Sequence, residues 1–129
     1  MTITELYTSV FDQWAEGMSD TKIGTNVSAD PLSTLKKLPY ATMSLVSAID
    51  TGHDLDNAAS GCNMMVQTDI YVDVDTRISE SMVLDEKSNE IMSSLGFRRE
   101  TALSLDYDLS GVKRIISRYN RIVGYGEFI

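Results

Sequence analysis

Three aspartates near the middle of the chain have the residue type and spacing that could do chemistry. Asp69, Asp73 and Asp75 alternate with other residues, so they share one face if their segment is a strand. Carboxylates on one face can bind a divalent cation or act as an acid/base pair. Asp69 and Asp73 would lie about 13 Å apart along a strand, too far for one shared ion. No second cluster in the sequence supplies further ligands, so a solvated face or an interface is the better interpretation.

A second acidic segment, DTGHDLDNAASG at residues 50–61, resembles the start of a calcium-binding loop. Counted from Asp54, however, the position that needs glycine holds Ala59, and the closing bidentate position holds Met65 instead of Glu. A polar loop tip is therefore the preferred interpretation, and we expect it to be mobile. The residues of this tip that we expect to contact an assembly partner are Asp50, His53, Asp54 and Asp56.

The one cysteine and the one histidine, Cys62 and His53, could form a nucleophile and base pair. Both flank the same polar loop without an obvious orienting partner, so a small residue at a strand start and a surface histidine are preferred. A single cysteine cannot form an internal disulfide, which favours a reducing compartment. The sequence has no phosphate-binding loop and no metal-ligand cluster. We therefore expect no enzyme activity, no cofactor and no metal.

The net charge of −8 is unevenly distributed along the 129 residues, a length typical of one domain. Residues 1–75 hold 11 acidic and 3 basic residues, whereas residues 76–129 hold 8 of each. Six of those bases lie near the C-terminus: Arg98, Arg99, Lys113, Arg114, Arg118 and Arg121. An acidic protein does not hold duplex DNA by neutralising phosphates. The acidity indicates either a solvated surface or complementarity between acidic and basic faces of neighbouring copies.

Hydrophobic periodicity predicts the elements that must position these residues. One face of the segment 62–75 carries Met64, Val66, Thr68, Ile70, Val72 and Val74, the alternation of a strand buried on one side. A capping box of Thr2 and Glu5 opens a first helix, and Gly96 ends a second helix that Asp75 or Thr76 caps. The predicted elements are a helix at 3–17, strands at 40–49 and 62–75, a helix at 77–95, and a hairpin of strands at 97–105 and 112–123.

This order, α-β-β-α-β-β, predicts a single domain over residues 1–129 with an α+β fold. Short connections favour antiparallel neighbours, so we expect a two-layer sandwich: a mainly antiparallel sheet with two helices on one face. Long loops are expected at about 18–39 and 50–61, with a possible short strand near 22–27 in the first. A short extension follows at 124–129.

The C-terminal half also resembles a known family. The helix ending MSSLGFRR at residues 92–99, a polar turn, and the strand KRIISRYNRIV at residues 113–123 resemble small tail proteins of tailed bacteriophages. The strand opening LPY at residues 38–40, after an N-terminal helix and a long loop, is also similar. These proteins are the tail terminators, also called tail-to-head joining or tail completion proteins, and include the U-like minor tail proteins.

The resemblance implies a structural virion protein. Such proteins form hexameric rings that cap the tail tube, end its polymerisation and join the tail to the head connector or head-completion protein. The implied partners are further copies of this chain, the tail tube protein and the connector, while DNA passes through the ring without specific binding. The implied location is the tail or neck of the virion, and the host cytoplasm during assembly.

The family has no fixed interface motif, so the interface residues are chosen on physical grounds. A closed ring needs complementary faces on one subunit, which the acidic and basic segments can supply. The candidates for a subunit interface or for the lumen of the ring are Asp69, Asp73, Asp75, Arg98, Arg99, Arg114 and Arg118.

Other functions also fit this sequence. A monomeric or dimeric non-viral binding module and a related phage head-completion or neck protein are the alternatives, and a small hydrolase or isomerase using the aspartates is a third. No apolar run reaches membrane-spanning length, so no membrane partner is expected. The segment MTITELYTSVF lacks a basic region, so we do not expect a signal peptide.

Overall fold

A computed structural model describes residues 2–29, 38–51, 61–73, 75–107 and 112–124 of the chain. The elements are α1 (Ile3–Met18), β1 (Val27–Ser28), β2 (Tyr40–Thr51), β3 (Gly61–Asp73), α2 (Ile78–Ser94), β4 (Arg98–Tyr107) and β5 (Val112–Gly124). Two helices and a five-stranded, mostly antiparallel sheet confirm the α+β class. The structure has one strand more than the predicted order, because β1 lies inside the first long loop, where the sequence indicates a possible short strand near 22–27.

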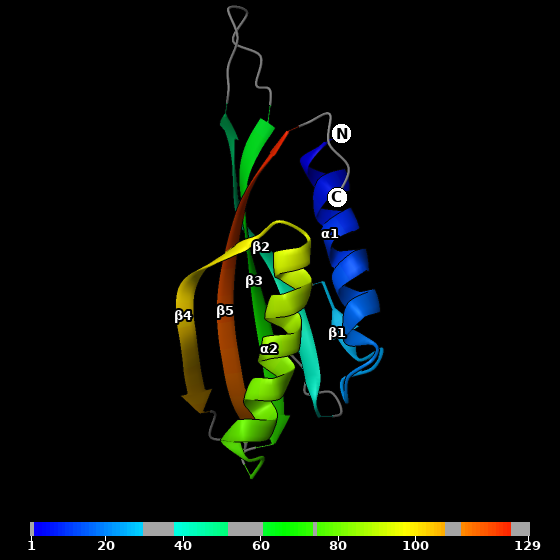
Figure 1. Ribbon diagram of the computed structural model, residues 1–129, viewed down its shortest axis with the longest axis vertical. Helices are drawn as coiled ribbons and strands as arrows, with labels where there is room; N and C mark the ends of the chain where they lie inside the picture. Colours follow the sequence, from blue (N-terminus) through cyan, green and yellow to red (C-terminus); the bar gives the residue numbers. More distant parts are fainter. Residues whose placement is uncertain (1, 30–37, 52–60, 74, 108–111, 125–129) are drawn as a thin grey trace, which may run out of the picture.

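The sheet has the strand order β1-β2-β3-β5-β4. The short strand β1 pairs in parallel with β2 through Val27 and Ala41, so the sheet is mixed. The other three pairings are antiparallel, and β3 and β5 pair along all 13 residues of each. In Figure 1 the upper ends of β2, β3 and β5 reach beyond the end of α2.

The helix α1 begins where its capping box predicts. The Thr2 hydroxyl accepts a hydrogen bond from the Glu5 N–H at 3.1 Å, and the Glu5 carboxylate accepts one from the Thr2 N–H at 3.4 Å. Both bonds satisfy amides that have no partner within a helix. The buried stripe of α1 consists of Leu6, Val10, Trp14 and Met18.

The strand β3 has the burial pattern that the sequence predicts, since Met64, Val66, Thr68, Ile70 and Val72 are all buried. Val74, expected on the same face, lies outside the described residues. It ends at Asp73, two residues earlier than expected. Asp75 therefore lies in a turn, where its N–H donates to the Asp73 carboxylate at 2.9 Å, and the prediction that it shares the strand face is wrong.

The helix α2 ends as predicted but begins differently. Gly96 has a φ of +87°, the left-handed conformation that favours glycine after a helix. The N-cap is Arg77, which makes no side-chain capping bond, because Asp75 and Thr76 belong to the preceding turn. Three of its most buried side chains are polar: Ser81, Asp85 and Ser88.

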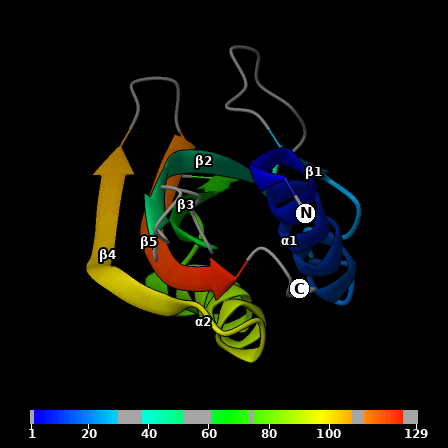
Figure 2. The same ribbon diagram turned by 90° about the horizontal axis from the view of Figure 1, so that it is seen from above.

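One apolar core joins both helices to one face of the sheet. The α1 stripe, Leu84 and Met92 of α2, and alternate residues of β2, β3 and β5 belong to a single buried cluster. Trp14 links the two helices directly, because its indole N–H donates to the Ser88 hydroxyl at 2.9 Å. Figures 1 and 2 show α1 near β1 and β2, and α2 near β5.

Candidate assembly surface

The face of the sheet opposite the core cluster carries most of the predicted interface residues, and we call it the outer face. Cross-strand register places its side chains in rows over β2, β3 and β5. Two of the rows are Tyr40, Tyr71 and Arg114, and then Ser44, Gln67 and Arg118. Among the described residues, neither helix contributes to this face. Strand alternation, together with the pairing of β3 with β5, therefore brings Asp69, Arg114 and Arg118 together.

Asp69 is the centre of the outer face and is only 5% exposed. Its carboxylate accepts a hydrogen bond from the Gln67 amide at 2.9 Å, and it lies 4.0 Å from the Arg114 guanidinium. Burial raises the pKa of this carboxyl, while Gln67, Arg114 and Tyr71 act in the opposite direction. Burial is the largest effect, so the charged form is less favourable here than in water.

Two aromatic rings border Asp69. Tyr40 and Tyr71 stack with their ring centroids 4.5 Å apart and their planes within 6°. Burial, together with the charges of Tyr71 and Asp69, raises the pKa of Tyr40. This half of the outer face is therefore a closely packed polar and aromatic cluster.

The other half of the outer face exposes apolar side chains. Ile49 and Ile122 lie on either side of Asn63 in the register and are 62% and 68% exposed. Exposed apolar residues that gather on one surface mark sites of protein interaction more often than isolated ones do.

Basic side chains lie beside these isoleucines. Arg118 is exposed, and its Nε donates to the Gln67 side chain at 2.9 Å. Arg98 pairs in register with Asn120 of β5, and its side chain is 86% exposed at 3.7 Å from the Glu100 carboxylate. A surface hollow of about 470 Å³ lies here, lined by Asn63, Gly96, Arg98, Glu100, Asn120, Arg121 and Ile122.

Arg99 lies apart from Arg98, because adjacent residues of a strand point to opposite faces. Its guanidinium is 2.7 Å from the Asp85 carboxylate and donates to the Tyr119 hydroxyl at 3.3 Å. The Ser117 hydroxyl donates to the other Asp85 oxygen at 2.9 Å. Burial raises the pKa of Tyr119. This group holds α2 against β4 and β5.

This network is not evident from the amino-acid sequence alone. Its only signal is helical spacing, since Ser81, Asp85, Ser88 and Met92 fall on one side of α2 at intervals of three and four residues. Because most residues of this stripe are polar, a search for apolar periodicity does not detect it. The strand partners Ser117 and Tyr119 are two residues apart, as residues on one strand face must be.

The remaining predicted interface and loop-tip residues lie at the ends of β2 and β3 or outside the described residues. Asp73 is exposed at the end of β3, and Asp75 is exposed in the next turn. Asp50 belongs to β2, which runs to Thr51, so it is not part of the predicted loop tip. Its side chain and the residues His53, Asp54 and Asp56 lie outside the described residues.

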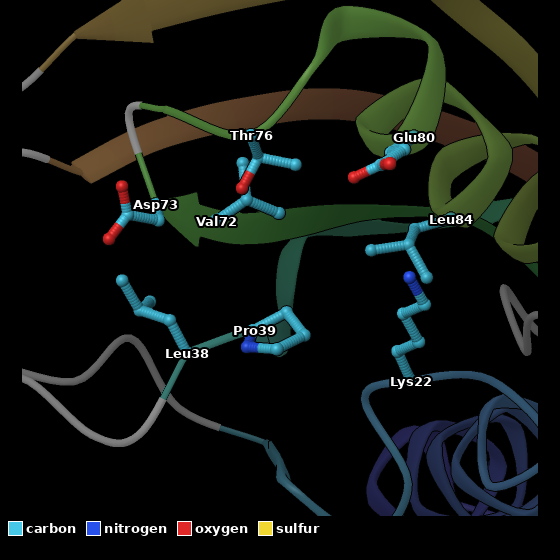
Figure 3. Close-up of a pocket in the computed structure, with 8 residues that line it drawn as sticks. All are labelled: Lys22, Leu38, Pro39, Val72, Asp73, Thr76, Glu80 and Leu84. Atoms are coloured by element: carbon cyan, nitrogen blue, oxygen red, sulfur yellow. The ribbon is translucent and has the colours of Figure 1, made fainter.

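Another cavity lies between α2 and the segments that precede β1 and β2. Figure 3 shows Lys22, Leu38 and Pro39 on one side of it and Thr76 and Glu80 on the other. Its volume of about 200 Å³ is below the range of about 300–1,000 Å³ typical of ligand pockets.

Within the described ranges, no group of three His, Cys, Asp or Glu residues could hold a metal ion. No helix in the described ranges is long and apolar enough to span a membrane.

Comparisons with known proteins find similarity at the level of the fold. No protein-family model matches the sequence, and no curated protein matches it significantly. A solved protein that carries only a sequence number is similar with a TM-score of 0.56 and 14% identity, over 98% of this chain and 100% of that chain. A chain from the virion of a native gene transfer agent particle is similar with a TM-score of 0.51 and 14% identity, over 92% of this chain and 94% of that chain. At this identity the likeness shows a shared fold.

Proposed function

We propose that this chain is a structural protein of a phage-like virion. The observation that carries the proposal is its likeness, over nearly the whole length of both chains, to a chain of a gene transfer agent virion. The outer face adds independent support. It presents exposed isoleucines beside exposed arginines, the combination of apolar residues and Arg that is enriched at the centre of protein interfaces.

Within the virion, the proposed role is that of a tail terminator. Copies of the chain form a closed ring, with six as the expected number, that caps the tail tube and ends its polymerisation. The ring then joins the tail to the head connector or head-completion protein. A ring needs a heterologous interface, in which two different surfaces of one subunit meet. The exposed acidic residues of α1 and the arginines of the outer face can supply two such surfaces.

The same proposal gives the partners and the location. The chain binds further copies of itself, the tail tube protein and the connector, and it acts without catalysis or a cofactor. DNA passes through the ring without specific binding, which the net charge of −8 supports because like charges repel. The protein belongs in the tail or neck of the virion, and in the host cytoplasm during assembly.

The native mass of the purified chain tests this proposal. Native mass spectrometry across a hundredfold range of concentration should give one closed oligomer, alone or in equilibrium with the monomer. Electron microscopy of that oligomer should show a ring with a central channel. A strict monomer or dimer at every concentration would instead favour a binding module with the same fold.

A further inference from the structure

Charge is segregated between one helix and one strand of the fold. The helix α1 contains three acidic residues, Glu5, Asp12 and Glu16, and no basic residue. All three are exposed and lie on one side of the helix, opposite the buried stripe. The strand β5 shows the reverse composition, with four basic residues and no acidic residue.

The basic residues of β5 divide between the two faces of the sheet. Lys113 donates to the Thr76 carbonyl at 2.8 Å, and Arg121 donates to the Leu95 carbonyl at 2.7 Å, so both stabilise the subunit itself. Arg114 and Arg118 lie on the outer face, where Arg98 of β4 extends the basic row opposite Asn120. Arg98 and Arg118 are the exposed members of this row.

The acidic and basic rows have similar lengths. Glu16 lies eleven positions after Glu5, which is about 16 Å along a helix. In β5, Asn120, the partner of Arg98, lies six positions after Arg114, which is about 20 Å along a strand. A helix laid along the basic row can therefore place each carboxylate within reach of a guanidinium.

We propose that α1 of one subunit docks on the outer face of the next subunit, with its acidic row against Arg98, Arg114 and Arg118. This inference rests on the ring proposed above and assigns its interface. The occupant of the outer face is a second copy because the complementary row is part of the same chain. The two surfaces differ, so the contact is heterologous and each subunit uses both, as a closed ring requires.

The surroundings of the basic row favour a protein partner. Ile122 and the hollow beside it adjoin Arg98, so the docked helix would cover apolar surface as well as charge. Charge pairs at such an interface determine orientation and association rate, and buried apolar contacts supply much of the affinity. A single-stranded or duplex nucleic acid on the same arginines would instead oppose the acidic surface of the rest of the chain.

Charge reversal on each surface tests the inference. The sheet variant is Arg98→Glu with Arg118→Glu, and the helix variant is Asp12→Arg with Glu16→Arg. Each alone should raise the dissociation constant for assembly at least tenfold, because like charges then face one another. Circular dichroism should show that both remain folded, since all four side chains are exposed.

Restoration of assembly is the decisive readout, because a misfolded variant cannot be rescued. A chain with all four substitutions has both rows reversed and should assemble within threefold of the wild type. An equal mixture of the sheet variant and the helix variant should also form rings, in which the two alternate. Native mass spectrometry should then detect equal numbers of the two chains.

A matched control uses the acidic pair of α2. Glu86→Arg with Glu90→Arg makes the same change of charge at the same helical spacing, and both residues are exposed. This control should assemble like the wild type. If the wild type forms rings and neither row variant weakens them, the α1 interface is wrong while the proposed ring stands. If the wild type remains monomeric at every concentration, the proposed ring and the proposed α1 interface are both wrong.

Discussion

At the scale of single residues, Asp69 shows how a strand face can hold a carboxylate that burial disfavours. Gln67 and Arg114 bind it, yet burial is the larger effect and raises the pKa of this carboxyl above its ordinary value of 3.8. The folded protein therefore holds the Asp69 proton more tightly than the unfolded chain does. Stability from this group is fully present below pH 3.8 and is lost as the pH rises through the folded pKa.

The variant Asp69→Asn tests this sign. Asparagine cannot ionise and has nearly the same shape, so the variant should have a higher free energy of unfolding than the wild type at pH 7. The difference in the free energy of unfolding should shrink as the pH falls toward 3.8, because the wild-type carboxyl then becomes neutral as well. Urea titrations at several pH values provide the measurement, with Asp73→Asn on the same strand as the exposed control. A less stable Asp69→Asn variant at pH 7 would show that the attraction of Arg114 outweighs burial.

At the scale of elements, buried polar contacts hold the two helices in place. The Trp14–Ser88 bond joins α1 to α2, and the Asp85 carboxylate joins α2 to Arg99 of β4 and Ser117 of β5. The side chain of Asp85 is almost fully buried, so each of its oxygens needs a partner. Position and orientation of α2 therefore depend on these bonds as well as on apolar packing.

The variant Asp85→Ala measures the strength of this connection. It leaves the partly buried Arg99 without its carboxylate and should lower the free energy of unfolding by about 3 kcal/mol. The adjacent exposed residue supplies the control, since Glu86→Ala should change stability by less than about 0.5 kcal/mol. Chemical denaturation followed by tryptophan fluorescence is suitable, because Trp14 is buried in the same core. Equal effects of the two variants would contradict a structural role for Asp85.

At the scale of the whole molecule, the distribution of charge matters more than the net value. Acidic residues occupy the exposed side of α1, while arginines occupy part of the outer face. A subunit with opposite charges on different surfaces favours one orientation of its neighbour and disfavours others.

An electrostatic interface between subunits should depend on salt. Raising the NaCl concentration from 0.05 M to 1 M shortens the screening length to about 3 Å, so the dissociation constant for assembly should rise about tenfold. Sedimentation velocity at matched protein concentrations gives this constant, and the four-substitution chain described above should respond in the same way. Assembly that strengthens with salt would indicate an interface dominated by apolar contacts.

The sequence by itself determined the features that depend on neighbouring residues. The capping box of Thr2 and Glu5, the buried face of β3 and the left-handed Gly96 all follow from local spacing, and so does the α+β class. The first three are each encoded within one or two turns of a helix or one strand, where side-chain direction has a fixed period, and the class follows from the succession of such segments. Local patterns do not determine where a strand ends. The turn at Asp75 was therefore not predicted from the sequence.

Only the tertiary structure decided which segments meet. The order β1-β2-β3-β5-β4, the parallel β1 and the burial of Asp85 under Arg99 join residues that are distant in sequence. Arg98 and Arg99 are neighbours in the chain, yet one faces solvent and the other faces α2. Periodicity predicts that adjacent strand residues point apart, but the choice of the buried side depends on which element packs there. That choice is made by the total burial and hydrogen bonding of the folded chain, which no local segment contains.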